Sequence, residues 1–350
     1  MTIADAAGRR TGKVRRVRLE DIAATCGVSL SSVSRALAGD KGVRPDVREK
    51  ILKAAKAANY SMPWTAAGQK VIVAASSAAM IDYVRNQFTL HVLEGLRERA
   101  VSLGLELVTR PIASTADEVA VLAEARQDDR VLGLLLLTLD DEDMLAATRS
   151  FDKAVVLVNG DDPEMRLSSV TPCNRSAARL ATDHLIGLGH RDILFLMRAG
   201  RRTIDRRREG WQDALAQAGI PADPDRVVLV DDWLPELGAR AIVERVRQRG
   251  LDFTAVLAAG DSLAVGAMMG IQQLGYTMPD DVSVMGMDDL PQGAFLNPPL
   301  TTMHIPMHEI GAAALDLLRE QVAGPPALAR RIELACHLVE RQSTAKARSV

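Results

Sequence analysis

From residue 71 onward, short apolar runs alternate with segments of helical length, and this alternation constrains the fold more than any other feature of the chain. The runs are rich in Val, Leu and Ile, as is typical of strands that are buried on both faces of a parallel sheet. They are VIVAAS (71–76), LELVTR (105–110), VLGLLLLT (131–138), AVVLVN (154–159), DILFLM (192–197), VVLV (227–230), AVLAA (255–259) and VSVMGM (282–287).

Amphipathic segments between or after these runs predict helices, at 88–103, 117–127, 141–150, 176–188, 207–218, 236–249, 262–274 and 307–320. Strands that alternate with helices predict an α/β fold whose parallel sheets are covered by helices on both faces. About 270 residues is large for one such sheet, so we expect two lobes with a cleft between them. Ligands of open α/β sheets bind beyond the carboxyl ends of strands, and residues that directly follow strands are therefore the candidates for a binding site.

The segment LEDIAATCGVSLSSVSRAL (19–37) is predicted to form a helix-turn-helix. Ala23 lets two short helices approach, and Gly27 accepts the backbone angle of a tight turn. The hydroxyl of Ser29 can cap the second helix. The predicted helices cover 19–26 and 30–38, and a third covers 45–58. The alternative is a helical hairpin with ordinary core packing.

The net charge of −2 hides an asymmetry along the chain. The first 70 residues contain 14 Lys and Arg against 6 Asp and Glu, whereas the rest contains 29 against 39. Basic clusters are often only solvated surface, but one that encloses a helix-turn-helix favours contact with nucleic-acid phosphates. Residues 1–16 are polar and basic without apolar periodicity, which predicts a disordered arm.

Several classes of protein are disfavoured by the sequence. No apolar run approaches the ~20 residues that span a bilayer, and the N-terminus lacks the apolar core of a secretory signal. We therefore expect a cytoplasmic, nucleoid-associated protein with no membrane partner. Cys26, Cys173 and Cys336 lack CxxC spacing and are predicted to be reduced thiols. His304 and His308 do not form an HExxH motif, and no GxSxG, Walker or GxGxxG motif occurs, so no metal, cofactor or catalytic residue is predicted.

Four ordered segments resemble the LacI/GalR (lactose-repressor) family of bacterial transcription regulators. They are RLEDIAATCGVSLSSVSRALAG with VRPDVREKILKAAKAANY (18–39, 43–60), HLIGLGHRDILFL with RRREGW (184–196, 206–211), AVLAAGDSLAVGAMMGIQQLGYTMPDDVSVMGMDDLP with NPPLTTMHIPMHEIG (255–291, 297–311) and HLVERQST (337–344). The resemblance implies a three-helix DNA-binding domain and an effector domain similar to periplasmic sugar-binding proteins, with three crossovers between two lobes.

The domain limits that the resemblance implies are a DNA-binding domain at 17–60, a hinge linker at 61–70 and an effector domain at 71–343. Lobe one would hold about 71–171 and 304–333, and lobe two about 172–303 and 334–343. The implied function is transcriptional repression, with double-stranded operator DNA and a sugar-like small molecule as partners, by a homodimer or a tetramer. A transport-type solute-binding protein and an enzyme on a two-lobed scaffold are the alternatives.

The candidate DNA contacts lie at the second helix and in the hinge. Leu30 and Ser31 occupy the turn where family members contact bases, and Arg35 can bind guanine or a phosphate. The alternative for Arg35 is a surface salt bridge. Further candidates for phosphate or capping contacts are Ser29, Ser32 and Ser34. Where relatives insert a hinge leucine into the minor groove, Met62 or Trp64 is the candidate wedge; a disordered hinge is the rival hypothesis.

The candidate effector contacts follow predicted strands. Arg207, three residues before Gly210, matches the ligand-binding arginine of the family, whereas Arg206 and Arg208 are expected to face solvent. Asp288 can accept hydrogen bonds from sugar hydroxyls, although it can instead cap the following segment. The remaining candidates are Asn159 and Asp261 at strand ends, and Phe88 and Trp233 as stacking faces or, alternatively, as isolated core anchors.

Two departures from the family pattern affect the effector site. Gly260-Asp261 stands where many members have Asn-Asp, which removes one amide, and Cys173-Asn174 stands where an Asp-Asn pair is common. Both suggest an effector that differs from a simple hexose.

Overall fold

The computed structural model describes residues 18–38, 42–57, 68–77, 80, 83–148, 150–323 and 328–348. The chain divides into two compact units, Met1–Ala67 and Gly68–Val350. The predicted arm and the hinge candidates Met62 and Trp64 lie outside the described residues. Within the described ranges, no helix has both the length and the apolar character needed to cross a membrane.

The first unit contains the predicted helix-turn-helix. Its helices are α1 (Leu19–Cys26), α2 (Leu30–Ala38) and α3 (Pro45–Ala57). Gly27 has φ 66° and ends α1 in the left-handed conformation that glycine adopts most easily. The backbone N–H of Ser32 donates to Ser29 Oγ at 3.2 Å, so the predicted cap on α2 is present.

All three helices of the first unit share one core. Ile22, Val33 and Ile51 come from α1, α2 and α3 in turn, and each is buried. The Lys50 ammonium donates to the carbonyl oxygen of Cys26 at 3.0 Å, at the end of α1 where backbone carbonyls lack helical partners. The third helix thus closes the core that an isolated hairpin would leave open.

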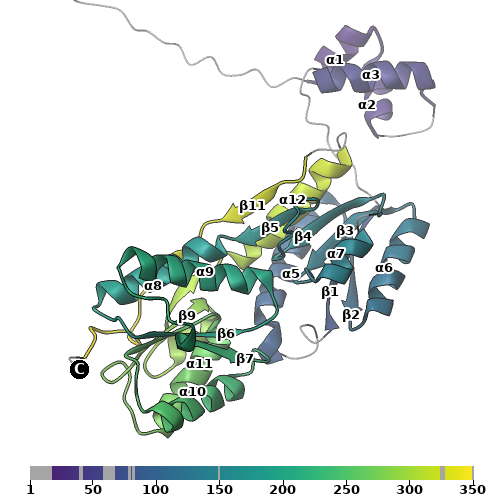
Figure 1. Cartoon of the computed structure of the whole chain (residues 1–350). Coiled ribbons are helices and arrows are strands. Elements are labelled where there is room, and N and C mark those ends of the chain that lie inside the picture. Colours follow the sequence, from purple (N-terminus) through teal and green to yellow (C-terminus); the bar gives the residue numbers. More distant parts are fainter. Residues whose placement is uncertain are drawn as a thin grey trace, which may run out of the picture. The chain divides into compact units, whose positions relative to one another are not determined.

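The described part of the second unit contains two six-stranded sheets (Figure 1). The first has the order β11-β5-β4-β3-β1-β2 and is parallel throughout. Its strands are β1 (Lys70–Ser76), β2 (Glu106–Ile112), β3 (Val131–Leu137), β4 (Ala154–Val158), β5 (Ser168–Pro172) and β11 (Arg331–Leu334).

The second sheet has the order β12-β10-β9-β8-β6-β7, and only β12 pairs in antiparallel fashion among its described strands. Its strands are β6 (Ile193–Arg198), β7 (Val227–Val230), β8 (Ala255–Ala258), β9 (Ser283–Asp288), β10 (Thr301–His304) and β12 (His337–Val339). We call the sheet with β1 and its helices the first lobe, and the sheet with β6 and its helices the second lobe.

Helices cover both sheets, as the α/β prediction requires. The helices of the first lobe are α5 (Tyr83–Leu103), α6 (Thr115–Gln127), α7 (Glu142–Thr148) and α12 (Met307–Ala323). Those of the second lobe are α8 (Asn174–Gly187), α9 (Arg202–Gln217), α10 (Pro235–Arg249) and α11 (Asp261–Gln273), with short 3₁₀ turns at Pro224–Arg226 and Pro291–Phe295. Each lobe has its own apolar core between its sheet and its helices.

Strands β5, β10 and β11 escaped the apolar pattern because their sequences, SSVTP, TTMH and RIEL, are short and largely polar. Most residues of β5 and β10 are nevertheless buried, and the hydroxyl groups of Ser168, Thr171, Thr301 and Thr302 have partners. Ser168 Oγ accepts from the Arg330 N–H at 3.1 Å, and Thr302 Oγ1 donates to Asp261 at 2.6 Å. Paired hydroxyls are therefore accommodated in these strands without the desolvation cost of unpaired groups.

The described chain passes between the lobes at three places, which we call the crossovers. The first follows Pro172 at the end of β5, the second lies between His304 and Met307, and the third joins Leu334 of β11 to His337 of β12. Both sheets therefore contain strands from distant parts of the sequence.

Gly210 lets α8 and α9 approach closely, and this predicts opposite effects for two Gly→Ala substitutions. A Cβ atom at Gly210 would overlap the backbone carbonyl oxygen of Arg175, whereas one at Gly187 meets no atom within 4 Å. We expect Gly210→Ala to lower the free energy of unfolding by about 1–3 kcal/mol through overpacking. Gly187→Ala should be neutral or raise it by up to about 1 kcal/mol. Urea denaturation of both variants measures this, and equal effects would contradict the packing described.

Candidate functional site

One face of α2 is exposed and carries the predicted DNA contacts. Leu30, Ser31, Ser34 and Arg35 are exposed, and Val33 points into the core of the first unit. The predicted contacts Ser29 and Ser32 lie at the start of this face, where the cap fixes the hydroxyl of Ser29. The helix therefore presents short polar side chains and one cation on a single face.

The guanidinium of Arg35 contacts its own helix. Its Nε donates to the carbonyl oxygen of Ser31 at 3.2 Å, and among the described residues no ion pair to Arg35 is found. The guanidinium is exposed on the same face as Leu30. This arrangement leaves a guanidinium available for a base edge or a phosphate.

A cavity of about 320 Å³ lies between the two lobes. Its walls come largely from residues at or just after the carboxyl ends of strands in both sheets, which is where α/β sheets bind ligands. These residues include Ser76, Thr138, Asn159, Arg198, Gly260 and Asp288.

Five of the six predicted effector contacts line this cavity: Phe88, Asn159, Arg207, Trp233 and Asp288. Phe88 comes from α5 of the first lobe, and Trp233 from the segment between β7 and α10 of the second. Both rings are partly buried, and Trp233 also packs against the apolar core of the second lobe. Asp261 is not among the lining residues.

Arg207 is the most tightly held charge at the cavity. Its side chain is 3% exposed, and Nε donates to Asn174 Oδ1 at 2.8 Å. One terminal nitrogen donates to the carbonyl oxygen of Ala259 at 2.5 Å and lies 3.5 Å from Asp288 Oδ1. The close approach at Gly210, one turn later in α9, sets Arg207 beside the start of α8. Buried cations need such partners because desolvation penalises an unpaired charge.

Three cavity residues have a strained backbone. Thr138, Asn159 and Asp288 have φ values of 58°, 51° and 142°, and they follow or end β3, β4 and β9. Such conformations are costly for residues other than glycine and concentrate at functional sites. Asp288 uses its carboxylate toward Arg207, and the following 3₁₀ turn has Leu290 as its N-cap residue instead.

Asn159 has an acceptor without a partner. The residue is 6% exposed, and its Oδ1 atom finds no hydrogen-bond donor in the described part of the chain. An unpaired buried acceptor costs about 1–3 kcal/mol. A donor group on a bound ligand would remove that penalty.

Asp261 lies behind the cavity wall at the first turn of α11. Its carboxylate accepts from the Leu290 N–H at 2.8 Å and from Thr302 Oγ1 at 2.6 Å. Burial, together with the negative charge of Asp288, raises the pKa of Asp261 to about 7. Burial also raises the pKa of Asp288, to about 6, while the Arg207 charge opposes this shift. The pKa values of both carboxyl groups are therefore raised toward neutral pH.

The missing side chain of Gly260 makes room for Trp233. A Cβ atom built on Gly260 would lie 3.1 Å from the Trp233 ring and 3.3 Å from Asp288 Oδ2. The backbone of Gly260 is extended, with φ −173°, so space and not backbone conformation favours glycine here. The Trp233 indole therefore lies beside position 260, where many family members have the amide side chain of asparagine.

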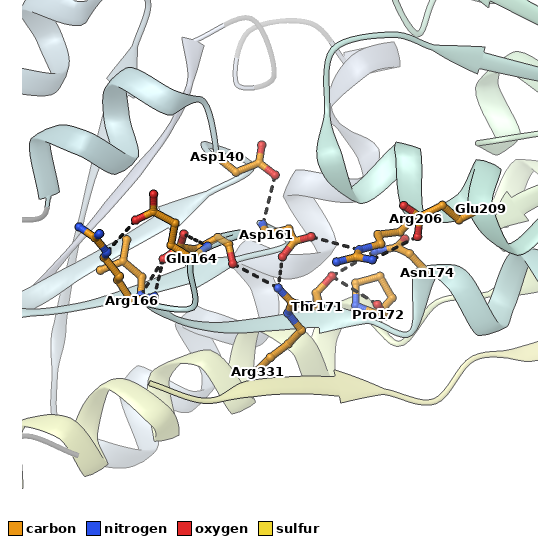
Figure 2. A network of polar contacts seen from close by, with 12 residues as sticks. Asp140, Asp161, Glu164, Arg166, Thr171, Pro172, Asn174, Arg206, Glu209 and Arg331 are labelled. Atoms are coloured by element: carbon orange, nitrogen blue, oxygen red, sulfur yellow. Dashed lines mark hydrogen bonds and ion pairs between the residues drawn. The ribbon is translucent and has the colours of Figure 1, made fainter. Parts of the chain in front are cut away.

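Sequence reasoning missed a polar network that joins the lobes beside the cavity (Figure 2). Asp161, in the loop after the first lobe's β4, accepts from Arg206 of α9 at 3.2 Å and also from Arg331 of β11. Arg206 was expected to face solvent, and 36% of its side chain is exposed; besides its contact with Asp161, it pairs with Glu209 of its own helix at 3.1 Å. Arg208 instead pairs with Asp205 at the surface, at 3.1 Å.

A second contact between the lobes involves Arg201, at the start of α9. Its guanidinium donates to the carbonyl oxygen of Asn159 at 2.6 Å and lies 3.4 Å from Asp140 Oδ1. Both acceptors belong to the first lobe. No local sequence pattern singles out Asp140 as a partner of the other lobe, and neither arginine carries a signal that sets it apart in an Arg-rich segment.

Comparison with known proteins identifies the family. Residues 18–62 match the bacterial regulatory proteins of the lacI family, and residues 182–344 match a periplasmic binding protein-like domain. The chain is 32% identical to the HTH-type transcriptional regulator MalR of Streptomyces coelicolor, over 94% of this chain and 97% of MalR. The chain belongs to the LacI family.

Solved structures of transcriptional regulators show the same fold. The transcriptional regulator CelR in complex with cellobiose is 27% identical, with a TM-score of 0.73 over 94% of this chain and 100% of that chain. The lac repressor dimer bound to operator and the anti-inducer ONPF is also 27% identical, with a TM-score of 0.69 over 95% and 100%. The present LacI-family protein is thus a DNA-binding transcriptional regulator with an effector-binding domain.

The raised pKa of Asp261 predicts how stability varies with pH. A carboxyl group that binds its proton more tightly when folded stabilises the fold at low pH, and this stabilisation is lost as the pH rises through about 7. The free energy of unfolding should therefore fall by roughly 2 kcal/mol between pH 5 and pH 8. Asp261→Asn, which stays neutral, should reduce this fall. Urea denaturation at both pH values measures it, and an unchanged fall in the variant would contradict the assignment.

Proposed function

We propose that this LacI-family protein is a repressor whose operator affinity is controlled by a sugar or sugar derivative bound in the cavity between the lobes. The DNA-binding domain would comprise 17–60, the hinge 61–70 and the effector domain 71–343. The observation that carries the proposal is the unpaired Oδ1 of Asn159, which lines the same cavity as the guanidinium of Arg207. A ligand that donates a hydrogen bond to the Asn159 oxygen and accepts one from the Arg207 guanidinium fits this arrangement.

The composition of the cavity favours a ligand rich in hydroxyl groups. Each hydroxyl both donates and accepts, so it can satisfy the Asn159 oxygen, the Asp288 carboxylate and the Arg207 fork in turn. Phe88 and Trp233 supply ring faces from opposite lobes, against which the C–H face of a sugar ring can pack. The CelR–cellobiose complex is a related protein with a bound sugar.

Control of DNA binding would follow from the two lobes. Arg201 and Arg206 of α9 reach across to acceptors of the first lobe, so a change in lobe arrangement exchanges these contacts. An effector that prefers one arrangement shifts the population toward it, by no more than its difference in affinity for the two. In a homodimer, which is the state of the lac repressor bound to operator, such a shift would change how two DNA-binding domains fit one operator in the bacterial cytoplasm.

The proposed ligand site predicts a contrast between two adjacent arginines. Purified protein is first screened by thermal denaturation against cellobiose, maltose, ribose and related sugars, because a ligand at 100 times its Kd stabilises by about 2.7 kcal/mol. For a sugar that stabilises the protein, Arg207→Ala should raise the Kd about 10- to 100-fold through loss of charged hydrogen bonds. Isothermal titration calorimetry measures the Kd.

Arg208→Ala is the matched control, because it removes the same charge one residue away and breaks only a surface pair with Asp205. Its Kd should stay within about twofold of the unmodified protein, since surface pairs contribute little. Circular dichroism verifies that both variants fold. Equal losses in both variants, or no loss in Arg207→Ala, would exclude the proposed role of Arg207.

The proposed DNA contacts predict a loss of specificity for Arg35→Ala. Binding sites are selected from random duplexes by the purified protein, and mobility shifts compare a selected site with a scrambled one. Loss of a contact to a base edge should reduce the difference in binding free energy between the two duplexes by about 1–3 kcal/mol. Arg44→Ala removes the same charge from an exposed position beside Asp46. This control should lower the affinity for both duplexes by the same factor. An unchanged ratio in Arg35→Ala would refute base recognition by Arg35.

A further inference from the structure

Two cysteines meet at the first and third crossovers. Cys173 directly follows β5 and is the N-cap residue of α8, and Cys336 lies between β11 and β12. Strands β5 and β11 pair in parallel with Pro172 opposite Leu334, and the Cys173 N–H donates to the Leu334 carbonyl oxygen at 2.9 Å. Residues 163 positions apart in the sequence are thereby held side by side.

The two side chains are in contact. The thiol of Cys336 hydrogen-bonds Cys173 and also lies 3.8 Å from the carbonyl oxygen of Leu334. Both cysteines are free thiols. The pairing of β5 with β11 brings the two thiols close enough to interact, and a disulfide between them would link the ends of two paired strands.

The two thiols differ in character. The hydrogen bond from Cys336 lowers the pKa of Cys173 to about 6, against the opposing effect of burial. The same hydrogen bond and burial raise the pKa of Cys336. Cys173 is partly exposed and Cys336 is buried. A reachable thiolate next to a protonated thiol is the arrangement in which oxidants react with one sulfur and the other resolves the product.

We propose that Cys173 and Cys336 form a reversible disulfide that makes the effector domain of this regulator responsive to hydroperoxides. The sequence alone predicts only separate reduced thiols, since the spacing between the two cysteines contains no motif. The proposal concerns a modification of the crossovers, and it does not depend on the identity of the effector or of the operator.

The reaction with hydrogen peroxide proceeds in two displacements. The Cys173 thiolate attacks one oxygen, the O–O bond breaks, and the leaving hydroxide takes a proton, so that a sulfenic acid and water form. Cys336 Sγ then attacks the sulfenic sulfur, the S–O bond breaks, and the hydroxide leaves as water with the Cys336 proton. One peroxide is reduced by two electrons and each sulfur is oxidised by one. A low-molecular-weight thiol or a dithiol protein reverses the step by thiol–disulfide exchange.

A disulfide at this place would act on the cavity through two routes. It would fix two of the described crossovers to each other, which opposes relative movement of the lobes about them. It would also restrain the first residue of α8, Asn174, whose Oδ1 accepts from Arg207. Oxidation would thus limit the change of lobe arrangement on which a response to effector depends.

Peptide mapping of the full chain tests the proposal directly. The protein is treated with one to a few equivalents of hydrogen peroxide, the remaining thiols are alkylated under denaturing conditions, and tryptic peptides are analysed by mass spectrometry without reductant. We expect a linked species of peptides 167–175 and 332–341, which dithiothreitol separates, and an alkylated peptide 19–35 that carries Cys26. Sulfinic acid on Cys173 without the linked species, or a disulfide between two chains, would overturn the proposal.

Cysteine variants test whether the linked species depends on Cys173 and Cys336 and not on Cys26. Cys173→Ser and Cys336→Ser should each abolish the linked species, whereas Cys26→Ala, which changes a cysteine of the first unit, should leave it unchanged. In the untreated protein, the rate of iodoacetamide labelling of peptide 167–175 should be half-maximal near pH 6. Half-maximal labelling near pH 8.5, the value of an ordinary cysteine, would remove the basis for selective reaction at Cys173.

Discussion

The buried guanidinium of Arg207 is the interaction on which the cavity depends. A cation with 3% exposure is stable only because Asn174, the carbonyl oxygen of Ala259 and the Asp288 carboxylate surround it. These partners come from the start of α8, the end of β8 and the end of β9. One side chain thus fixes the positions of three elements that form the cavity wall of the second lobe. Gly210 is equally necessary, because it lets α9 approach α8 closely enough for the contact with Asn174.

The charges around this centre have different functions within the same helix. Arg207 has its partners within the second lobe. Arg201, nearly two turns earlier, and Arg206, the preceding residue, donate to acceptors of the first lobe. Contacts of the first kind lie within one lobe, whereas those of the second kind join the two lobes. Helix α9 therefore both lines the cavity and connects the lobes. Asp161 shares its carboxylate between Arg206 and Arg331, so this contact also reaches the start of β11 (Figure 2).

The sequence predicted the alternating architecture well because buried parallel strands need apolar residues on both faces. It could not mark β5, β10 and β11, whose hydroxyl and charged groups have partners that only the folded chain brings near. Strand ends placed Asn159 and Asp288 at the cavity, since a parallel sheet collects its carboxyl ends at one edge. The same rule selected Asp261, whose carboxylate turns toward Leu290 and Thr302 instead. Arg206 and the pair of Cys173 with Cys336 depend on contacts across many residues, and no local pattern reports such contacts.

The fit between Gly260 and Trp233 couples two positions of the cavity wall. A Cβ atom at 260 would lie 3.1 Å from the indole and 3.3 Å from Asp288 Oδ2, so a larger residue there requires a shift of the indole or of the carboxylate that faces Arg207. A smaller residue at 233 would instead leave an empty space beside Gly260. The contour of the wall at this corner is therefore set by both residues together.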